Sequence, residues 1–506
     1  MRSCRGVVIA AANPVTTPTR PRADNYHWVA LFAVSLSVVT TVVDFSGITV
    51  ALPTIADDLD LSLPSASWVI LASTLTILAF LVPAASLSDR LGRKRSYILG
   101  LFLFGGGAIA VAISPSFGFL IGARIVQSAG IGIIQTNSYA IIATVFPANQ
   151  RGKGIGAYTS TVGLAGIAGP IIGGVVVEAM GWRSFFLISA GLATIATFAA
   201  IRLLDASRVN APRRPASGPG FDWAGAVLSG TMLVVFIAAI NTGSRIGWDS
   251  PWIIGAFPLA FLLLGLFIWR ELNIERPMLD LHVFANMPYS WSMATRFLGF
   301  LSGSGWRFLM PFYLQEVRGF QPSQVGFLVF SSAVGMAIFS IVSGWLSDRF
   351  GTRRWVVLGL AIIVGTSVFY STLGVATPVA IIIAVLFVSG MGLGLWEVPN
   401  TTSALDAGDD ASMNTTGALV NVTRNAGNIT SIAVASSIVT GVLVARGFEP
   451  DLALVGDDTT GAMANAFLDG ARYVYIALAF AGVAGILTAW RVVSRRKGPE
   501  STSTTL

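Results

Sequence analysis

The chain has 506 residues, of which 54% are hydrophobic and only 11% are Asp, Glu, Lys or Arg. Soluble domains carry about 25% charged residues, so these few charges exclude a set of soluble domains, and most of the chain must face lipid. The formal net charge of +7 does not indicate nucleic-acid binding, because the basic residues recur in short loops between apolar runs.

Residues 1–27 precede the first long apolar run. They contain a short apolar stretch, Val7 to Ala12, followed by Pro14, Pro18 and Pro21. The stretch is too short for the core of a signal peptide, so we expect a disordered cytoplasmic arm. The single cysteine, Cys4, lies in this arm, and an internal disulfide is therefore excluded.

Fourteen apolar runs follow, each close to the roughly 20 residues that a membrane-spanning helix needs. The runs lie at 28–52, 66–87, 96–114, 117–142, 154–178, 183–204, 223–241, 251–270, 289–317, 324–346, 355–374, 378–398, 414–444 and 472–493. Runs 289–317 and 414–444 are long, and we expect them to tilt, break or project beyond the bilayer.

Lysine and arginine are concentrated on one side of this arrangement when both termini are cytoplasmic, as the positive-inside rule requires. The predicted outer segments hold only Arg183, Arg245, Arg318, Arg446 and Arg472. One inner segment, 399–413, departs from the rule because it has no basic residue and three aspartates. The pattern predicts an all-α, multi-pass protein of the plasma or inner membrane.

An internal repeat organises the chain. Residues 85–95 read ASLSDRLGRKR and residues 344–354 read GWLSDRFGTRR, and each stretch follows the second helix of a block. The repeat predicts two six-helix halves separated by two extra helices. The predicted division is a cytoplasmic arm at 1–27, a first half at 28–204, a cytoplasmic linker at 205–222, two central helices at 223–270, a second half at 271–493 and a cytoplasmic tail at 494–506.

Further motifs accompany the repeat. The first span reads DFSGITVALPTI, the fourth has Arg124 followed by Gln127, and the fifth reads GIAGPIIGG over 166–174; FYLQEVRGFQPSQVGF and NVTRNAGN follow late in the chain. Over 28–493 these motifs resemble the major facilitator superfamily, and most closely its fourteen-span drug:proton antiporter family of multidrug and antibiotic exporters. The resemblance implies twelve superfamily helices plus two central ones and a transport function.

The sequence departs from that family at several positions. Ala85 stands where the first loop usually has Gly, Ser46 and Thr49 replace Thr and Asn in the first-helix motif, and Ser128 replaces a Gly in the fourth. These departures put a generic drug substrate in doubt more than they do the fold.

The two loops of the repeat are predicted cytoplasmic gates. Gly92 lets the chain turn sharply, Asp89 can face a helix N-terminus or an arginine, and the basic residues can meet anionic lipid. By resemblance, the loops latch the halves during alternating access; a basic loop that only sets topology is the alternative. The predicted gate residues are Asp89, Arg90, Gly92, Arg93, Lys94, Asp348, Arg349, Gly351 and Arg353.

Asp44 and Arg124 are the predicted proton-coupling pair. An intramembrane charge normally faces a cavity and finds a partner. Asp44 lies ~13 Å from the outer end of its predicted helix and Arg124 ~11 Å from the same end of its own. We hypothesise that Asp44 takes up a proton and that Arg124 favours its ionised form. A static ion pair that fixes helix packing is the alternative.

The fifth span carries the predicted antiporter motif. Its glycines permit close helix approach, and Pro170 favours a kink. By resemblance the motif is typical of exporters, whereas ordinary packing of small residues is the alternative. The motif residues are Gly166, Gly169, Pro170, Gly173 and Gly174.

Interior polar residues supply candidates for a substrate cavity between the halves, near the midplane. The second half has three interior arginines and no clear interior acid, since Glu397 is placed near the cytoplasmic end of its span. Arg296 and Arg307 share a helix face and are expected to bias the cavity toward anionic or zwitterionic solutes, with snorkelling or pairing elsewhere as the alternative. The cavity candidates are Gln127, Gln135, Asn137, Arg296, Trp306, Arg307 and Arg424.

No GxxxxGK[ST] loop, HExxH, cysteine pair or GxSxG motif occurs, so we expect no ATP site, no metal, no cofactor and no enzyme activity. The remaining energy source is an ion gradient. We predict a monomeric proton antiporter that exports amphiphilic small molecules and has no nucleic-acid partner. A dedicated exporter or symporter of one endogenous metabolite or lipid is the first alternative, and a membrane-embedded enzyme or sensor is a remote one.

Overall fold

The computed structural model describes residues 25–61, 63–210, 222–246, 250–274, 281–407, 413–448 and 461–491. Throughout these residues the chain is all-helical. Most of the predicted N-terminal arm and of the predicted linker, and the whole predicted C-terminal tail, lie outside the described residues.

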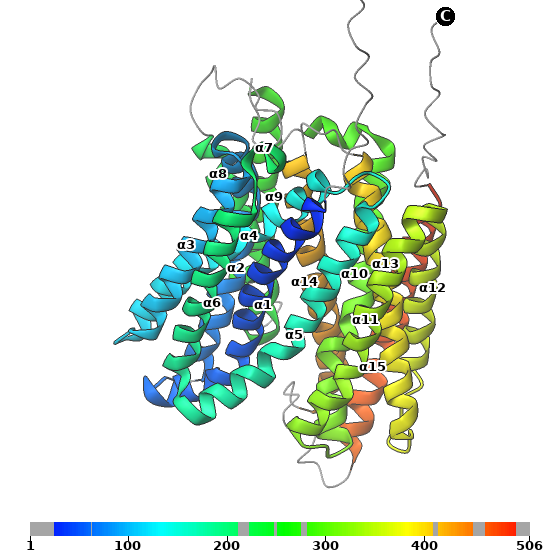
Figure 1. Ribbon diagram of the computed structural model, residues 1–506. Helices are drawn as coiled ribbons and strands as arrows, with labels where there is room; N and C mark the ends of the chain where they lie inside the picture. The colour runs from blue at the N-terminus through cyan, green and yellow to red at the C-terminus, as the bar shows by residue number, and fades with distance from the viewer. Residues whose placement is uncertain are drawn as a thin grey trace, which may run out of the picture.

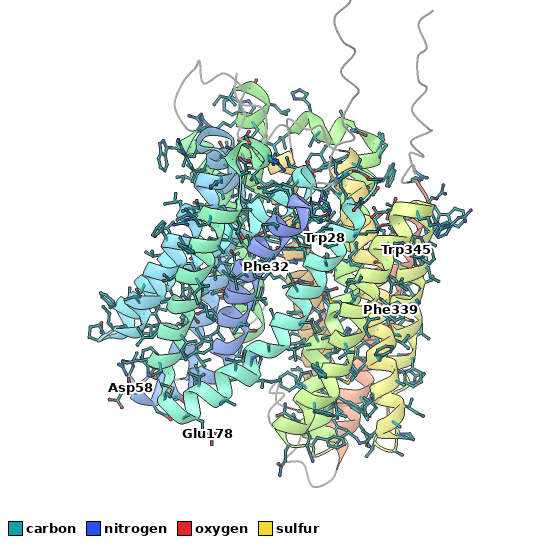
Figure 2. All side chains as sticks on the ribbon, in the orientation of Figure 1. Trp28, Phe32, Asp58, Glu178, Phe339 and Trp345 are labelled. Atoms are coloured by element: carbon teal, nitrogen blue, oxygen red, sulfur yellow. The ribbon has the colours of Figure 1, made fainter. Side chains whose placement is uncertain are left out.

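The first half is a block of six long helices. They are α1 (Tyr26–Asp58), α2 (Leu63–Leu91), α3 (Arg93–Ala112), α4 (Phe117–Val145), α5 (Arg151–Met180) and α6 (Trp182–Leu203), followed by the short α7 (Ala206–Val209). Figure 1 shows α1 beginning at the end of the bundle where α7 lies, which is the end that carries the basic loops. Figure 2 places Asp58 of α1 and Glu178 of α5 at the opposite, outer end.

The second half repeats this arrangement. After the 3-10 turn η1 (Leu281–Ala285) come α10 (Met287–Phe312), the π-helical turn η2 (Tyr313–Val317), α11 (Pro322–Phe350), α12 (Arg353–Tyr370), α13 (Val379–Ala407), α14 (Met413–Ala445) and α15 (Ala462–Arg491). The two halves stand side by side in Figure 1. The long predicted run 289–317 breaks near Pro311, which has no N–H to continue the α-helical hydrogen bonds.

The two central helices, α8 (Trp223–Ile246) and α9 (Pro251–Asn273), pack across the seam between the halves. Leu75, Leu78 and Leu81 of α2 form an apolar cluster with residues of α8 and with Val422 and Ile429 of α14. An apolar pocket of about 180 Å³ lies between α2, α8, α9 and α14. The extra helices therefore contact one helix of each half.

Among the described residues, twelve helices are long and apolar enough to cross a membrane. In α8 the apolar stretch, Trp223–Phe236, is shorter than the length required of a membrane span. Helix α10 is long enough, but its mean hydropathy is too low. With these two included, fourteen long helices run across the bundle. The exceptional polarity of α10 marks it as a helix that faces protein rather than lipid along much of its length.

Two helix ends differ from the sequence prediction by about nine or ten residues. α13 continues to Ala407 rather than ending near 398, and α15 begins at Ala462 rather than 472. Both extensions contain polar residues, and Asn400, Thr401 and Thr402 are buried. The hydropathy pattern ended α13 too early because protein contacts, rather than lipid, surround its polar turn. It began α15 too late because the first turns of that helix carry Asn465 and Asp469, whose side chains are not buried.

The halves meet closely where α5 runs beside α11. A Cβ on Gly344 would lie 2.2 Å from the carbonyl oxygen of Gly152, and a Cβ on Gly156 would lie 2.4 Å from that of Ser340. Farther along, the Ser160 hydroxyl donates to the Ala337 carbonyl over 2.6 Å. These contacts lie in the first turns of α5, so the seam is tightly closed at the cytoplasmic end.

The glycines of the fifth span hold α5 against α1. A Cβ on Gly169 would lie 1.8 Å from Ser46 Oγ and 2.8 Å from the Val43 carbonyl oxygen, and one on Gly173 would lie 2.9 Å from the Gly47 carbonyl oxygen. Gly166 and Gly174 have more room, with nearest atoms at 3.9 and 3.7 Å. Gly169 and Gly173 are therefore the positions where only a hydrogen fits.

This packing predicts opposite effects for two matched substitutions. Gly169→Ala should destabilise the protein by about 1–3 kcal/mol, because the new methyl group overlaps the backbone of α1. Gly174→Ala should be neutral or stabilising by up to about 1 kcal/mol, since alanine favours the helix and the methyl group has room. The midpoints of thermal unfolding of the purified variants in detergent measure both effects. Equal midpoints for the two variants would contradict the packing argument.

Candidate functional site

A fully buried polar network lies between the first four helices. Arg124 Nη1 of α4 lies 3.0 Å from Asp44 Oδ2 of α1, and the same nitrogen donates to Gln127 Oε1 over 2.6 Å. Gln127 Nε2 donates to Asp44 Oδ1 over 3.1 Å, and Arg124 Nε donates to Ser73 Oγ of α2 over 3.0 Å. All four side chains have no exposed surface.

Local helix geometry explains how the network forms. Arg124 and Gln127 are three residues apart on α4 and so project on one face. Asp44 and Arg124 stand at similar depth on helices of opposite direction, and the Phe186 ring lies 5.6 Å from the guanidinium carbon of Arg124. Both oxygens of Asp44 accept hydrogen bonds. Since removing one partner of a buried ion pair costs about 3–5 kcal/mol, each charge here depends strongly on the other.

The second gate loop holds the halves together through Asp348. Its carboxylate, on α11, accepts the backbone N–H of Gly152 over 2.8 Å and that of Lys153 over 3.0 Å. These N–H groups belong to the first turn of α5, where the helix dipole is positive and the backbone donors have no partner within the helix. A carboxylate of one half therefore caps a helix of the other half.

A second contact supports the same closure. Arg151 at the start of α5 pairs with Asp406 near the end of α13 over 2.8 Å. Asp406 is 45% exposed, so the pair is partly screened by water and weaker than the buried contacts of Asp348. Asp406 lies in the acidic inner segment, 399–413, that departed from the positive-inside rule. Its ion pair with Arg151 links the second half to the first.

The first gate loop differs from the second. Arg93 is 2% exposed; it donates to the Thr144 hydroxyl and to the Val209 carbonyl oxygen of the α7 segment, the latter over 3.3 Å. Lys94 Nζ donates to the Ile201 carbonyl oxygen over 2.8 Å. The expectation that the basic residues face lipid is wrong for Arg93, because neighbouring segments of its own half enclose it. Arg90 is exposed, and the side chain of Asp89 lies outside the described residues.

The other gate residues shape the loop ends. Gly92 and Gly351 adopt φ values of +87° and +85°, a conformation that favours glycine. Arg349 lies over the Trp345 and Phe350 rings, and Arg353 lies over the Trp490 ring, at about 5 to 6 Å. These arginines rest on aromatic rings near the membrane surface rather than bridging the halves.

A second charged cluster, in the other half, was missed by the sequence analysis. Glu397 of α13 is 2% exposed; its Oε1 lies 3.7 Å from Arg296 Nη2 of α10 and 4.0 Å from Arg424 Nη1 of α14. The prediction of no interior acid in this half is therefore wrong. Its cause is the early predicted end of α13, which placed Glu397 at a helix terminus. The polar residues after it were the signal that the helix continues inside the protein.

Arg296 is fixed by hydrogen bonds as well as by charge. Its Nε donates to the Val420 carbonyl oxygen over 2.8 Å, and its Nη1 donates to the Thr401 hydroxyl over 2.7 Å. The Phe300 ring lies 5.0 Å from its guanidinium carbon. Arg296 therefore joins α10, α13 and α14.

The remaining cavity candidates divide by exposure. Asn137 is fully buried, and Trp306 is 4% exposed in the core between α10, α12, α13 and α15, so neither faces open space in this conformation. The Gln135 side chain is partly exposed and the Arg307 side chain is exposed. The sequence placed these residues on inner helix faces but could not separate the packed ones from the accessible ones.

Within the described residues, no group of three or more His, Cys, Asp or Glu side chains is arranged to hold a metal ion. The charged residues described above make ion pairs and hydrogen bonds.

Comparison with known proteins places the chain in context. The family model for the Major Facilitator Superfamily matches residues 34–432. The riboflavin transporter RibZ of Clostridioides difficile is 29% identical over 379 residues, covering 75% of this chain and 80% of that protein. The multidrug resistance protein Stp of Mycobacterium tuberculosis is 29% identical over 423 residues, covering 83% and 77%. The methylenomycin A resistance protein of Streptomyces coelicolor is 26% identical over 427 residues, covering 83% and 88%.

Solved structures share the fold. The human organic anion transporter MFSD10 (TETRAN) aligns with a TM-score of 0.60 at 16% identity, covering 90% of this chain and 99% of that one. The proton:xylose symporter XylE aligns with a TM-score of 0.62 at 13% identity, covering 94% and 97%. The predicted all-α fold of two helical halves is thereby confirmed.

The capping contact predicts how the cytoplasmic end responds to loss of one charge. Asp348→Asn should weaken closure by about 1.5–3 kcal/mol, because hydrogen bonds to a charged group are lost. In a Cys4→Ser background, Ser160→Cys, buried between α5 and α11, should then react about tenfold or more faster with a membrane-impermeant maleimide added to inverted vesicles.

The matched control is Asp406→Asn, which breaks the more exposed pair with Arg151. Since such a pair contributes about 0.2–1 kcal/mol, labelling should rise much less. Equal labelling of the Asp348→Asn variant and the parent would contradict the capping role.

Proposed function

The chain belongs to the major facilitator superfamily, and from that premise we propose that it is a proton-coupled antiporter that exports amphiphilic small molecules, such as drugs or antibiotics, across the plasma membrane. Membership makes the chain a multi-pass secondary transporter rather than an enzyme. The direction of transport, the coupling ion and the class of solute are the proposed part.

The network around Asp44 is the observation that carries this proposal. Its carboxylate is fully buried, and among the described residues it pairs with one positive charge and one amide. Protonation of Asp44 would remove the charge that holds Arg124 and Gln127, and loss of the proton would restore it. A buried acid whose partners depend on its charge can exchange a proton and change helix contacts in one step.

The position of the network supports proton exchange with the outer side. Asp44 lies fourteen residues before the outer end of α1 at Asp58, about 21 Å along the helix, on the outer side of the contacts that close the cytoplasmic end. In the conformation described here the seam is tight at Gly152 and Gly344. A proton would therefore reach Asp44 from outside while the cytoplasmic end is shut.

Relatives support export of drugs or antibiotics. Two of the compared proteins are described as resistance proteins, against methylenomycin A and against multiple drugs. The glycine-proline motif of α5, packed against the helix that carries Asp44, would transmit a change at Asp44 to the inter-half contacts at the start of α5. Proton exchange and gate opening would thus be linked through one helix.

A dedicated transporter of one metabolite is the second candidate. It is favoured by the riboflavin transporter among the relatives and by the charged cluster of Glu397, Arg296 and Arg424, which a broad drug exporter does not need. A panel of cationic, neutral and acidic compounds in inverted vesicles separates the two. Transport of many unrelated compounds supports the first candidate, and transport of one chemical family supports the second.

The proton role of Asp44 gives a direct prediction. In inverted vesicles, Asp44→Asn should reduce proton-gradient-driven uptake of any compound that the wild-type protein transports to the level of vesicles without the protein. Exchange of labelled for unlabelled compound needs no net proton movement and should continue. Asp58→Asn is the control, because this outer carboxylate is 41% exposed and pairs with Arg183.

A further variant separates coupling from stability. Asp44→Glu keeps a titratable acid and should retain part of the driven uptake, provided that the thermal unfolding midpoint shows a folded protein. Undiminished driven uptake in the Asp44→Asn variant would exclude Asp44 as the proton carrier and leave it a static ion pair.

A further inference from the structure

The cluster of Glu397, Arg296 and Arg424 has an unbalanced charge. Two guanidinium groups face a single carboxylate, and the exposed fractions are 0% for Arg296, 3% for Glu397 and 18% for Arg424. In the first half, by contrast, Asp44 and Arg124 balance each other. An excess positive charge in a low-dielectric region is costly unless an anion neutralises it. The second half therefore has room, electrostatically, for one more negative group.

The contacts in the cluster are loose as well as unbalanced. Glu397 Oε1 lies 3.7 and 4.0 Å from the two guanidinium nitrogens, which is beyond hydrogen-bond distance. Among the described residues, Glu397 Oε1 and Arg296 Nη2 have no hydrogen-bond partner, although both are buried. Buried polar atoms are nearly always paired. Glu397 Oε1 and Arg296 Nη2 therefore attract each other without a hydrogen bond, and each atom can still take a further polar partner.

The two arginines are held very differently. Arg296 is fixed by two hydrogen bonds, to Val420 and Thr401. Arg424 is at 4.0 Å from Glu397, and it is the member of the cluster with accessible surface. A solute that enters the cluster would therefore contact Arg424 before Arg296. Arg296 Nη2, which has no hydrogen bond, lies farther from the accessible surface of the cluster. A carboxylate can bind such guanidinium nitrogens with two oxygens at once.

The cluster lies at the seam that alternating access must open. Asn421 of α14, one turn from Arg424, donates to the Gln135 carbonyl oxygen of α4 over 3.2 Å. A Cβ on Gly417, also on α14, would lie 3.0 Å from the carbonyl oxygen of Thr136, on α4. When the halves separate at their cytoplasmic ends, these contacts part and the cluster becomes reachable from the cytoplasm.

Neighbouring polar atoms without hydrogen bonds indicate which other groups a bound solute would carry. The side-chain oxygens of Gln135, Asn400 and Asn421 are buried without a hydrogen-bond partner among the described residues. Asn400 is next to Thr401, which hydrogen-bonds to Arg296, and Asn421 lies one turn from Arg424 and contacts Gln135 of the other half. Amide oxygens of this kind accept hydrogen bonds from hydroxyl or N–H groups. The surroundings fit an organic anion that carries such donors near its charged group.

Arg307 extends the positive surface. It lies eleven residues after Arg296 on α10, close to three helical turns, and therefore on about the same face and ~16 Å farther out. Its side chain is exposed, whereas that of Arg296 is buried. The outer and inner ends of this face thus both attract an anion.

We propose that Arg424 and Arg296 bind the carboxylate or an equivalent anionic group of the transported solute, with Glu397 as the internal anion that occupies the site when no solute is bound. This inference rests on the proposed transport function and specifies its substrate class as organic anions. Without solute, the anion site is then occupied by the protein's own Glu397 carboxylate. Solute binding replaces one carboxylate by another beside the same guanidinium groups.

Binding to the purified protein tests this proposal without depending on transport. Three probes share one apolar body: 1-naphthaleneacetate, its neutral amide 1-naphthaleneacetamide and the cation 1-naphthylmethylamine. Isothermal titration with protein in neutral detergent should give affinity for the carboxylate about tenfold or more above that for the amide, as expected for one charge-assisted guanidinium pair. The amine should bind more weakly still.

Three variants distinguish binding from structure. Arg424→Gln should remove the preference for the carboxylate over the amide, and Arg424→Lys should keep part of it. Glu397→Gln should strengthen binding of the carboxylate severalfold, because the competing internal anion is gone. A purely structural Glu397 predicts the opposite sign, since its loss would only disturb the arginines. Arg472→Gln, which removes an exposed outer charge, is the control and should leave all three affinities unchanged.

Equal affinity for the three probes, or an unchanged carboxylate preference in the Arg424→Gln variant, would overturn the proposal. So would weaker carboxylate binding in a folded Glu397→Gln variant. These outcomes are separate from failure of the proposed function. A protein that binds the carboxylate selectively but shows no proton-driven uptake would keep the anion site and contradict proton-coupled export.

Discussion

A charge inside a bilayer must find a partner, and this constraint shapes the interior of the protein. Arg124 and Asp44 meet that requirement with a 3.0 Å ion pair in which both Asp44 oxygens are hydrogen-bonded, although Arg124 Nη2 has no hydrogen-bond partner among the described residues. Arg296, Arg424 and Glu397 meet it only in part, with distances of 3.7 and 4.0 Å. The helices that carry these residues are placed by the need to bring the charges together, because each unpaired charge would cost several kcal/mol in this environment.

A charge is also neutralised at the cytoplasmic end, where the partner of a carboxylate is the N-terminus of a helix and not a side chain. Asp348 faces the first N–H groups of α5, whose partial positive charge replaces a cation. The contact is easily reversed, since both groups can be hydrated when the halves part. Close approach of Gly152 and Gly344 makes it geometrically possible. A carboxylate on one half and a helix start on the other thus form a latch that holds without a permanent ion pair.

The internal repeat does not make the halves equivalent. Arg124 lies on α4 seven residues after its start, whereas Glu397 lies on the corresponding α13 eighteen residues after its start, ~16 Å deeper along the helix. In the first half the closed network suits exchange of a proton. In the second half the positively charged cluster is the site that we propose for a larger anion. The two proposed sites, for the coupling ion and for the solute, would thus lie at different depths.

The sequence by itself determined the helices, their orientation and the depth match of Asp44 and Arg124, because hydropathy, loop charge and the constant rise of a helix are local properties. It showed the repeat that begins at Gly344, whereas the close contact of Gly344 with Gly152 is seen only in the structure. The tertiary structure alone decided which polar residues are partners: Glu397 appeared to end a helix, and the burial of Asn400 and Thr401 became visible only when α10 and α14 were packed around α13. Likewise, equal helical spacing could not tell that Arg296 is enclosed and Arg307 accessible. Burial depends on what neighbouring helices contribute, and no single stretch of sequence contains that information.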